Sequence, residues 1–252
     1  GYRPHVSLPG VDAKILKPQN VVEMLHAGSR DVGFAGADWV RELGADVVEV
    51  LDTGLDRVRL VAAAPAALLT SGRLPDRPVV VASEYERIAR GWIRDQGLHA
   101  SFVRSYGATE VFPPEDADCV LDIAATGDTL RAQNLEVFDE VMTSSTRLYA
   151  SSAAYADPAR RAGIDRLAML LGSVLEARRR VMVEVNVSRE CFAGVIGALP
   201  CMRQPTVSEL HGASGYAVKA AVPRERLPLL IPELKARGAT DIVVTEPAQI
   251  IP

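Results

Sequence analysis

Short apolar stretches that close on glycine alternate with helical patterns along the first half of the chain, and this alternation constrains the fold most. Residues 31–36 have the pattern of a short buried strand that ends at Gly36, and residues 38–43 have that of a helix that stops at Gly44. Helices alternating with short strands predict an α/β unit with a largely parallel sheet. The other elements expected here are a helix at 21–26 and strands at 46–51 and 59–64.

A second α/β unit follows residues 66–77, a stretch rich in Ala, Gly and Pro that is a candidate crossover between domains. In this unit we expect strands at 78–82, 100–104, 119–123 and 136–142, and helices at 84–96 and 129–134. The strand at 119–123 runs straight into Ala-Ala-Thr-Gly-Asp-Thr, so a loop of small and polar residues follows it.

The last third of the chain has a different order of predicted helices and strands. Residues 157–180 keep apolar positions at a three-and-four spacing, which predicts one long helix. Beyond it we expect strands at 181–187, 205–210, 215–222 and 241–245 and helices at 189–199 and 224–237. The order βαββαβ predicts a ferredoxin-like small domain, with a hairpin at residues 211–214.

Composition narrows the class of protein. The net charge of -4 and an aromatic content of 5% argue against a nucleic-acid partner, which usually needs a basic face or stacking platforms. The three cysteines form no Cys-x-x-Cys pair, and the four histidines are scattered, so neither a metal cluster nor a disulfide framework is expected. No apolar run reaches the ~18 residues of a membrane span, and no signal peptide opens the chain. We therefore expect a soluble cytoplasmic protein.

The clearest chemical signal is the loop after the strand at 119–123. Small residues such as Gly127 allow the backbone to approach a phosphate closely, and successive N–H groups at a helix start can bind that anion. Thr126 and Thr129 add hydroxyl donors, and Asp122 at the strand tip could accept hydrogen bonds from ribose hydroxyls. An ordinary strand-turn-helix with a capping threonine would have the same spacing, so both interpretations stay open on spacing alone.

Several ordered motifs together identify a family resemblance. The pattern Asp122-x-x-x-Thr126-Gly127-x-Thr129-Leu130 resembles the phosphoribosyl pyrophosphate loop of ATP phosphoribosyltransferases. Three further segments are similar to family motifs, and the βαββαβ tail is similar to the regulatory domain of the long form. These segments are Asp31-Val-Gly-Phe-Ala-Gly-Ala-Asp38, Arg59-Leu-Val-Ala-Ala-Ala-Pro65 and Gly107-Ala-Thr-Glu110 with Pro113.

The resemblance implies a fold and a reaction. It implies two α/β lobes like those of a periplasmic binding protein, with the site in the cleft, and a ferredoxin-like (ACT-like) C-terminal domain. It also implies that N1 of ATP displaces pyrophosphate from C1 of phosphoribosyl pyrophosphate with Mg²⁺ as cofactor, and that histidine inhibits a hexamer through the third domain. Family members open with a strand and a Gly-Arg loop, whereas Gly1-Tyr-Arg-Pro-His5 has the pattern of an internal strand, so we expect a shortened chain, a processed chain or a segment supplied by a partner.

Each candidate residue carries an alternative. Asp122 is the candidate catalytic residue, and Thr126, Gly127, Asp128 and Thr129 are the candidates for the 5′-phosphate. The carboxylate of Asp128 is unusual in an anion loop, and its side chain could point outward. Three further residues are substrate-binding candidates. Glu110 could instead be a solvated turn residue and Arg59 a surface arginine on a strand. Asp38 could instead be the N-cap of the next helix.

The expected domains are catalytic lobe I at residues 1–65 and 144–180, lobe II at 66–143, and a regulatory domain at 181–252. The main alternative from another class is a cytosolic two-lobed small-molecule-binding protein of the same fold, and a second is a catalytically inactive regulatory relative. The loop residues favour the enzyme, because fold alone does not separate these functions. The residues that would bind Mg²⁺ stay unknown.

Overall fold

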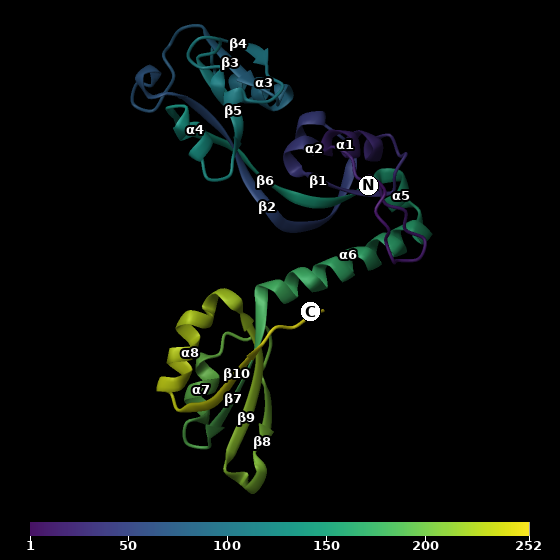
Figure 1. Cartoon of the computed structure of the whole chain (residues 1–252), viewed down its shortest axis with the longest axis vertical. Helices are drawn as coiled ribbons and strands as arrows, with labels where there is room; N and C mark the ends of the chain where they lie inside the picture. Colours follow the sequence, from purple (N-terminus) through teal and green to yellow (C-terminus); the bar gives the residue numbers. More distant parts are fainter. Residues whose placement is uncertain (252) are drawn as a thin grey trace. The chain divides into compact units, whose positions relative to one another are not determined.

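Two long neighbouring strands form the centre of the first half of the chain. The computed structural model describes residues 1–251, which divide into two compact units, Gly1–Asp165 and the part from Arg166 onwards. In the first unit, β2 (Val47–Pro65) pairs antiparallel with β6 (Leu135–Ser151) along nearly its whole length. Figure 1 shows these two strands running between the α1, β1 and α2 end of the unit and the β3, β4 and α3 end.

The remaining elements of the first unit extend this pair into a mixed sheet. In the described residues the sheet has six strands in the order β1-β6-β2-β5-β3-β4. The other strands are β1 (Val32–Gly36), β3 (Val79–Ser83), β4 (Ala100–Arg104) and β5 (Cys119–Ala124). The helices are α1 (Pro18–His26), α2 (Ala37–Leu43), α3 (Glu86–Asp95), α4 (Asp128–Ala132), α5 (Ser152–Ala156) and the start of α6 (Pro158–Arg179), with 3-10 turns η1 (Ala66–Leu68) and η2 (Thr109–Val111).

The expectation of a largely parallel sheet is wrong. The pairs β3–β4 and β3–β5 are parallel, but β1–β6, β2–β6 and β2–β5 are antiparallel. The sequence suggested separate strands at 46–51 and 59–64, whereas β2 is one strand with register shifts in its polar middle. Bulges of this kind let a strand continue without an apolar pattern. For the same reason the sequence indicated only residues 136–142 of β6 as a strand. The short helix α5 is not among the predicted elements.

Local signals explain most of the helices. Pro18 stands at the first turn of α1, where a missing N–H is harmless, and Val22 and Leu25 bury its apolar face. Gly44 adopts the left-handed conformation that ends α2. Asp157 accepts hydrogen bonds from the N–H groups of Ala159 and Arg160 at 2.8 and 3.2 Å, which caps the start of α6.

The end of β2 near η1 is buried on both faces, as in a central strand. Leu60 and Ala62 face a cluster that includes Trp92 of α3, whereas Val61 faces a second cluster with Leu130 of α4. A separate cluster at the other end of the unit contains Val22, Leu25, Ala35 and Tyr149. Buried clusters thus lie at both ends of the long strands, and the clusters at each end together count as one core, which gives the first unit two cores.

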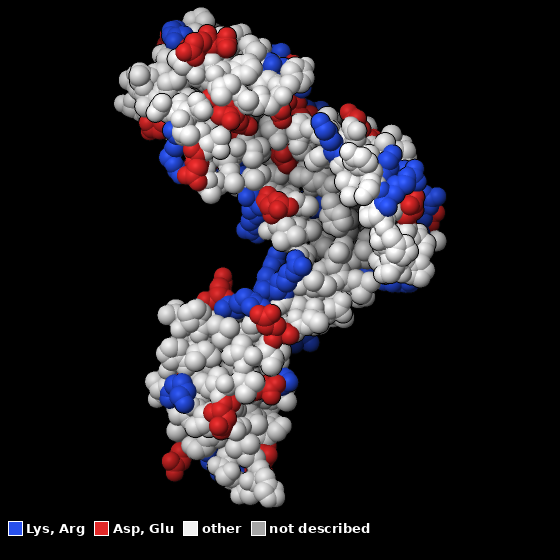
Figure 2. Space-filling view, in the orientation of Figure 1, with Lys and Arg blue, Asp and Glu red and all other residues white. Residues whose placement is uncertain are grey.

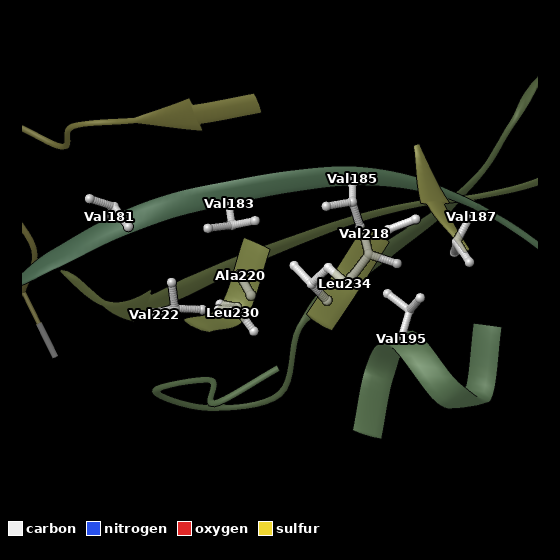
Figure 3. Packing of buried hydrophobic residues seen from close by; sticks show 11 residues of the cluster. Val181, Val183, Val185, Val187, Val195, Val218, Ala220, Val222, Leu230 and Leu234 are labelled. Atoms are coloured by element: carbon white, nitrogen blue, oxygen red, sulfur yellow. The ribbon is translucent and has the colours of Figure 1, made fainter. Parts of the chain in front are cut away.

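The second unit is a small domain of the order βαββαβ, as expected. Its antiparallel sheet has the order β10-β7-β9-β8. Valines at alternate positions of β7, from Val181 to Val187, pack on Leu230 and Leu234 of α8 (Figure 3). The bounds are β7 (Arg180–Ser188), α7 (Phe192–Ala198), β8 (Thr206–Glu209), η3 (His211–Ala213), β9 (Gly215–Pro223), η4 (Arg224–Arg226), α8 (Leu227–Ala236) and β10 (Ala239–Thr245).

Candidate functional site

Asp122 lies near the end of β5 with its side chain partly buried. Its neighbours on the same face of the strand, Val120 and Ala124, are buried. One carboxylate oxygen, Oδ1, accepts a hydrogen bond from the N–H of Ile123 at 2.7 Å. This contact orients the carboxylate at the start of the predicted phosphate loop.

The surroundings of Asp122 disfavour its charge. Burial, together with the carboxylates of Glu110 and Glu84, raises the pKa of this carboxyl to about 6, although the hydrogen bond from Ile123 acts in the opposite direction. The group is ionised at neutral pH but titrates within the range in which enzymes work. Perturbed carboxyls of this kind are frequent at functional sites.

The loop after β5 turns sharply at Gly127, whose φ of +81° is left-handed and favours glycine. The hydroxyl of Thr126 donates to Asp128 Oδ2 at 2.6 Å, and Arg131 forms an ion pair with the other oxygen of the same carboxylate. These two contacts lower the pKa of Asp128. The negative charge of Asp128 is thus balanced within the loop, and Thr129 beside it is exposed.

A pocket of about 420 Å³ adjoins this loop. Ala125 of the loop forms one side of it, and strands β2 and β6 form the rest. Arg59 lies in the pocket lining and pairs across the sheet with Ala124, immediately before the loop. The complete lining is Asp52, Arg57, Val58, Arg59, Ala125, Thr143, Ser144, Ser145 and Arg147.

Two of the three arginines in this pocket were not among the sequence candidates. Arg57 stands two residues before Arg59 on the same strand, and that period-two spacing could have identified it. Arg147 comes from β6, far away in the sequence, and no local pattern points to it. Its guanidinium lies 2.6 Å from Glu49 Oε2 and 3.6 Å from Asp52 Oδ2.

The other two candidates have different surroundings. Glu110 lies on η2, partly exposed, and contributes to the field around Asp122. Asp38 is only 6% exposed, and its carboxylate accepts from Ser144 Oγ at 2.5 Å and from the Tyr85 hydroxyl at 2.8 Å. The alternative that Asp38 is a helix N-cap is wrong, because Gly36 is the N-cap of α2. A substrate-binding role for either residue stays a prediction.

Comparison with known proteins gives the family. The family model described as ATP phosphoribosyltransferase matches residues 17–173, and the model described as HisG, C-terminal domain, matches residues 177–247. The chain belongs to the ATP phosphoribosyltransferase family. Because both models match, it is a long-form ATP phosphoribosyltransferase, a pentosyltransferase that transfers the phosphoribosyl group of phosphoribosyl pyrophosphate to N1 of ATP in the first step of histidine biosynthesis.

Individual relatives agree with this assignment. The ATP phosphoribosyltransferases of Pelotomaculum thermopropionicum and Desulforudis audaxviator are each 34% identical over 256 residues, covering 100% of this chain and 89% of theirs. That of Chlorobium phaeobacteroides is 32% identical and covers 96% of this chain and 84% of its own. The solved ATP phosphoribosyl transferase (HisG:HisZ) complex from Thermotoga maritima shares the fold, with a TM-score of 0.58 at 22% identity over 66% of this chain and 83% of that chain.

Within residues 1–251, no group of three or more His, Cys, Asp or Glu side chains is placed to hold a metal ion. None of the helices in that same range is long and apolar enough to cross a membrane. Figure 2 shows acidic and basic side chains intermixed on the visible face of each unit, rather than one continuous basic surface.

Proposed function

We propose that the phosphoribosyl transfer takes place where Asp122, the loop at residues 125–130 and the arginine-lined pocket adjoin. The observation that carries this proposal is the pairing of Arg59 with Ala124, because it sets a lining residue of the pocket beside the loop that follows Asp122. The guanidinium of Arg59 pairs with Glu140 at 3.3 Å at the surface. Phosphoribosyl pyrophosphate has a ribose between a 5′-phosphate and a pyrophosphate. The site offers a separate group of residues for each of these three parts.

Asp122 and the loop bind the ribose and the 5′-phosphate. The Asp122 carboxylate accepts hydrogen bonds from ribose hydroxyls, and it is ionised at neutral pH because its pKa is about 6. Backbone N–H groups of Thr126, Gly127, Asp128 and Thr129 bind the phosphate, helped by the hydroxyl of Thr129, while the Thr126 hydroxyl donates to Asp128. The ion pair with Arg131 keeps the charge of Asp128 from repelling that phosphate.

The arginines of the pocket bind the pyrophosphate and the phosphates of ATP. Arg57, Arg59 and Arg147 supply planar donors suited to phosphate oxygens. As N1 of ATP forms its bond to C1, the bond from C1 to the pyrophosphate oxygen breaks, and its electron pair leaves with the pyrophosphate. Positive charge develops on the ribose and negative charge on the leaving group, and we propose that Asp122 stabilises the first and the arginines the second.

Mg²⁺ is the cofactor that this chemistry requires, and it neutralises pyrophosphate charge when bound. Glu84 and Glu110 lie near enough to raise the pKa of Asp122, but within residues 1–251 no group of three such side chains is placed to hold a metal ion by itself. Mg²⁺ usually keeps several waters and binds through substrate phosphates, so few protein ligands are needed. Asp122 and Glu110 are the residues that would lie closest to it. Glu110 would also contact the adenine or ribose.

Regulation and assembly follow from the second unit. We infer that residues 181–252 form a regulatory domain through which histidine inhibits a hexamer, and that residues 1–65 with 144–180 and residues 66–143 form the two catalytic lobes. The match of the C-terminal family model and the βαββαβ order support this. A histidine titration without inhibition or thermal shift would contradict the regulatory part, and light scattering measures the oligomer.

The free thiols of Cys119, Cys191 and Cys201 support a reducing cytoplasm.

The test of the site compares this chain with two variants in the presence of ATP, phosphoribosyl pyrophosphate and Mg²⁺. Asp122→Ala is expected to lower formation of phosphoribosyl-ATP by about 100-fold or more, because a group stabilising the transition state is lost. Asp165→Ala is the matched control, since that exposed carboxylate pairs with Arg161 on α6 at 3.6 Å. Equal turnover by both variants would refute the role of Asp122. Binding of substrates without turnover by the unaltered chain would favour a binding or regulatory protein.

A further inference from the structure

Helix α2 crosses from one core of the first unit to the other. It packs with α1 and β1 through Trp39 and Val40, yet Trp39 also packs on the cluster that contains Tyr85, Ile88 and Trp92. The rings of Trp39 and Tyr85 lie 4.7 Å apart, centroid to centroid. The contact between α2 and α3 therefore joins the two cores independently of the long strands.

Two buried carboxylates one turn apart on α2 accompany this aromatic contact. Asp38 is 6% exposed and Glu42 is 8% exposed, although acidic side chains are seldom buried unless they are paired. Glu42 accepts hydrogen bonds from the N–H groups of Arg87 and Ile88, both at 3.0 Å. The N-cap residue of α3 makes no side-chain cap of its own, so Glu42 of another helix satisfies these N–H groups at its positive end.

Asp38 makes the second polar connection. The hydroxyl of Tyr85, immediately before α3, donates to one carboxylate oxygen at 2.8 Å, and Ser144 Oγ donates to the other at 2.5 Å. Burial and the charge of Asp38 both raise the pKa of Tyr85, so its hydroxyl stays a donor. Ser144 lies in the lining of the 420 Å³ pocket, so one carboxylate ties α3 to a wall of the proposed site.

A further hydrogen bond leads from Tyr85 towards the catalytic carboxylate. The N–H of Tyr85 donates to Ser83 Oγ at 3.0 Å, and the Ser83 hydroxyl in turn donates to the carbonyl of Leu121 at 2.6 Å. Leu121 is the residue before Asp122 on β5. A continuous set of buried contacts thus links α2 to Asp122 on one side and to the pocket wall on the other.

We propose that Asp38, Glu42 and Tyr85 form a latch between the two cores, whose function is to position Asp122 against the pocket wall for the transfer step. The inference rests on the proposed function, since it assumes that Asp122 and the pocket act on one substrate. Glu42 also caps α3, so these contacts stabilise the fold as well as orienting α2 against α3. Fixed hydrogen bonds define one relative geometry, and small displacements at a reacting centre have large effects on rate.

The test compares Tyr85→Phe, which removes one hydroxyl and keeps the ring, with Tyr155→Phe. The control deletes the same atom from a Tyr–Asp hydrogen bond of 3.2 Å that lies outside the latch, on α5. We expect kcat per active site to fall about 10-fold in Tyr85→Phe, with the calorimetric Kd for phosphoribosyl pyrophosphate alone within about 2-fold, because ground-state binding needs less exact positioning. Tyr155→Phe should retain kcat within about 2-fold.

A double-mutant cycle sharpens the test. If Asp38→Asn and Tyr85→Phe break one shared contact, the double variant should lose little more than the worse single variant. Three outcomes would each overturn the latch. The first is an equal kcat in Tyr85→Phe and Tyr155→Phe, and the second is a kcat loss in the double variant that equals the product of the two single losses. The third is a loss of kcat that is explained entirely by a smaller folded fraction. Asp122→Ala, measured in parallel, separates this from failure of the proposed site. If that variant keeps full turnover, the site itself is wrong, whereas if only Tyr85→Phe does so, the latch alone is wrong.

Discussion

The two principal strand pairs of the molecule use their side chains in opposite ways. In the second unit, β7 and β9 pair from Arg180 with Pro223 to Ser188 with Gly215 without a register shift, and valines fill the buried face. In the first unit, β2 and β6 pair with several register shifts, and their middle carries polar residues. Those polar groups are satisfied across the strands, for example by Thr146 Oγ1 on Asp56 at 2.9 Å and by Ser145 Oγ on Asp52 at 2.8 Å.

The difference shows that the β7–β9 pair mainly stabilises the fold, whereas the β2–β6 pair forms the pocket. A regular apolar pair stabilises one arrangement through burial, and its pattern is visible in the sequence. An irregular polar pair contributes less through burial, but its bulges direct arginines and hydroxyls into the pocket beside Ala125. Mutations in the two pairs should therefore change different measured quantities.

The largest effect is expected in the valine-rich core. Leu234 of α8 is fully buried, so Leu234→Ala should lower the free energy of unfolding of the second unit by about 3 kcal/mol through lost burial and a residual cavity. Leu229→Ala on the same helix, at a side chain 73% exposed, is the control and should change it by less than about 0.5 kcal/mol. Denaturant unfolding measures both. A fall in kcat per folded molecule would break the comparison.

In the polar pair the expected effect is on substrate binding. Arg147→Ala should raise the KM for phosphoribosyl pyrophosphate or ATP about 10- to 100-fold, with a smaller change in unfolding, because a charge-assisted contact to phosphate is lost. Arg160→Ala is the control, since Arg160 is exposed and pairs with Asp31 at 2.9 Å. Steady-state kinetics at constant ionic strength gives the answer. An unchanged KM with a large loss of stability would assign Arg147 to the fold.

Asp122→Asn tests whether the buried charge proposed for function lowers the stability of the fold. Folding raises the pKa of Asp122 from 3.8 to about 6, so above pH 6 the folded protein bears the buried charge, and below about pH 3 neither state does. The neutral variant should therefore be more stable at pH 7, by an amount on the order of 1 to 2 kcal/mol after allowance for partial exposure, and equal to the unaltered chain near pH 3. Unfolding at both pH values checks this; a gain that is the same at both would contradict it.

The smallest expected effect concerns the charge in the phosphate loop. Because Arg131 and Thr126 already balance the carboxylate, Asp128→Asn should lower the KM for phosphoribosyl pyrophosphate by no more than about 3-fold, as expected for an exposed charge. Asp116→Asn, an exposed position outside the loop, serves as control. A change of tenfold or more would mean that the side chain leaves Arg131 and meets the substrate directly.

Regular elements were predictable because their signals are local. The alternation at Val181 to Val187, the glycine that ends α2 and the small-residue loop after Cys119–Ala124 all lie within short windows of sequence. The middle of β2 was not predictable, because its polar residues match no strand period and pair only with a segment about ninety residues away. The antiparallel course of the sheet was missed for the same reason.

The sequence by itself determined the family, the βαββαβ tail and the loop that contains Thr126 and Gly127, since each depends on residue order over a short stretch. Tertiary structure alone brought Arg147 beside Arg59 and gave the buried carboxylate of Asp38 its partners on α3 and β6. It also raised the pKa of Asp122, because burial and neighbouring carboxylates exist only after folding. Contacts between distant segments depend on packing, and no local pattern encodes which of them will meet.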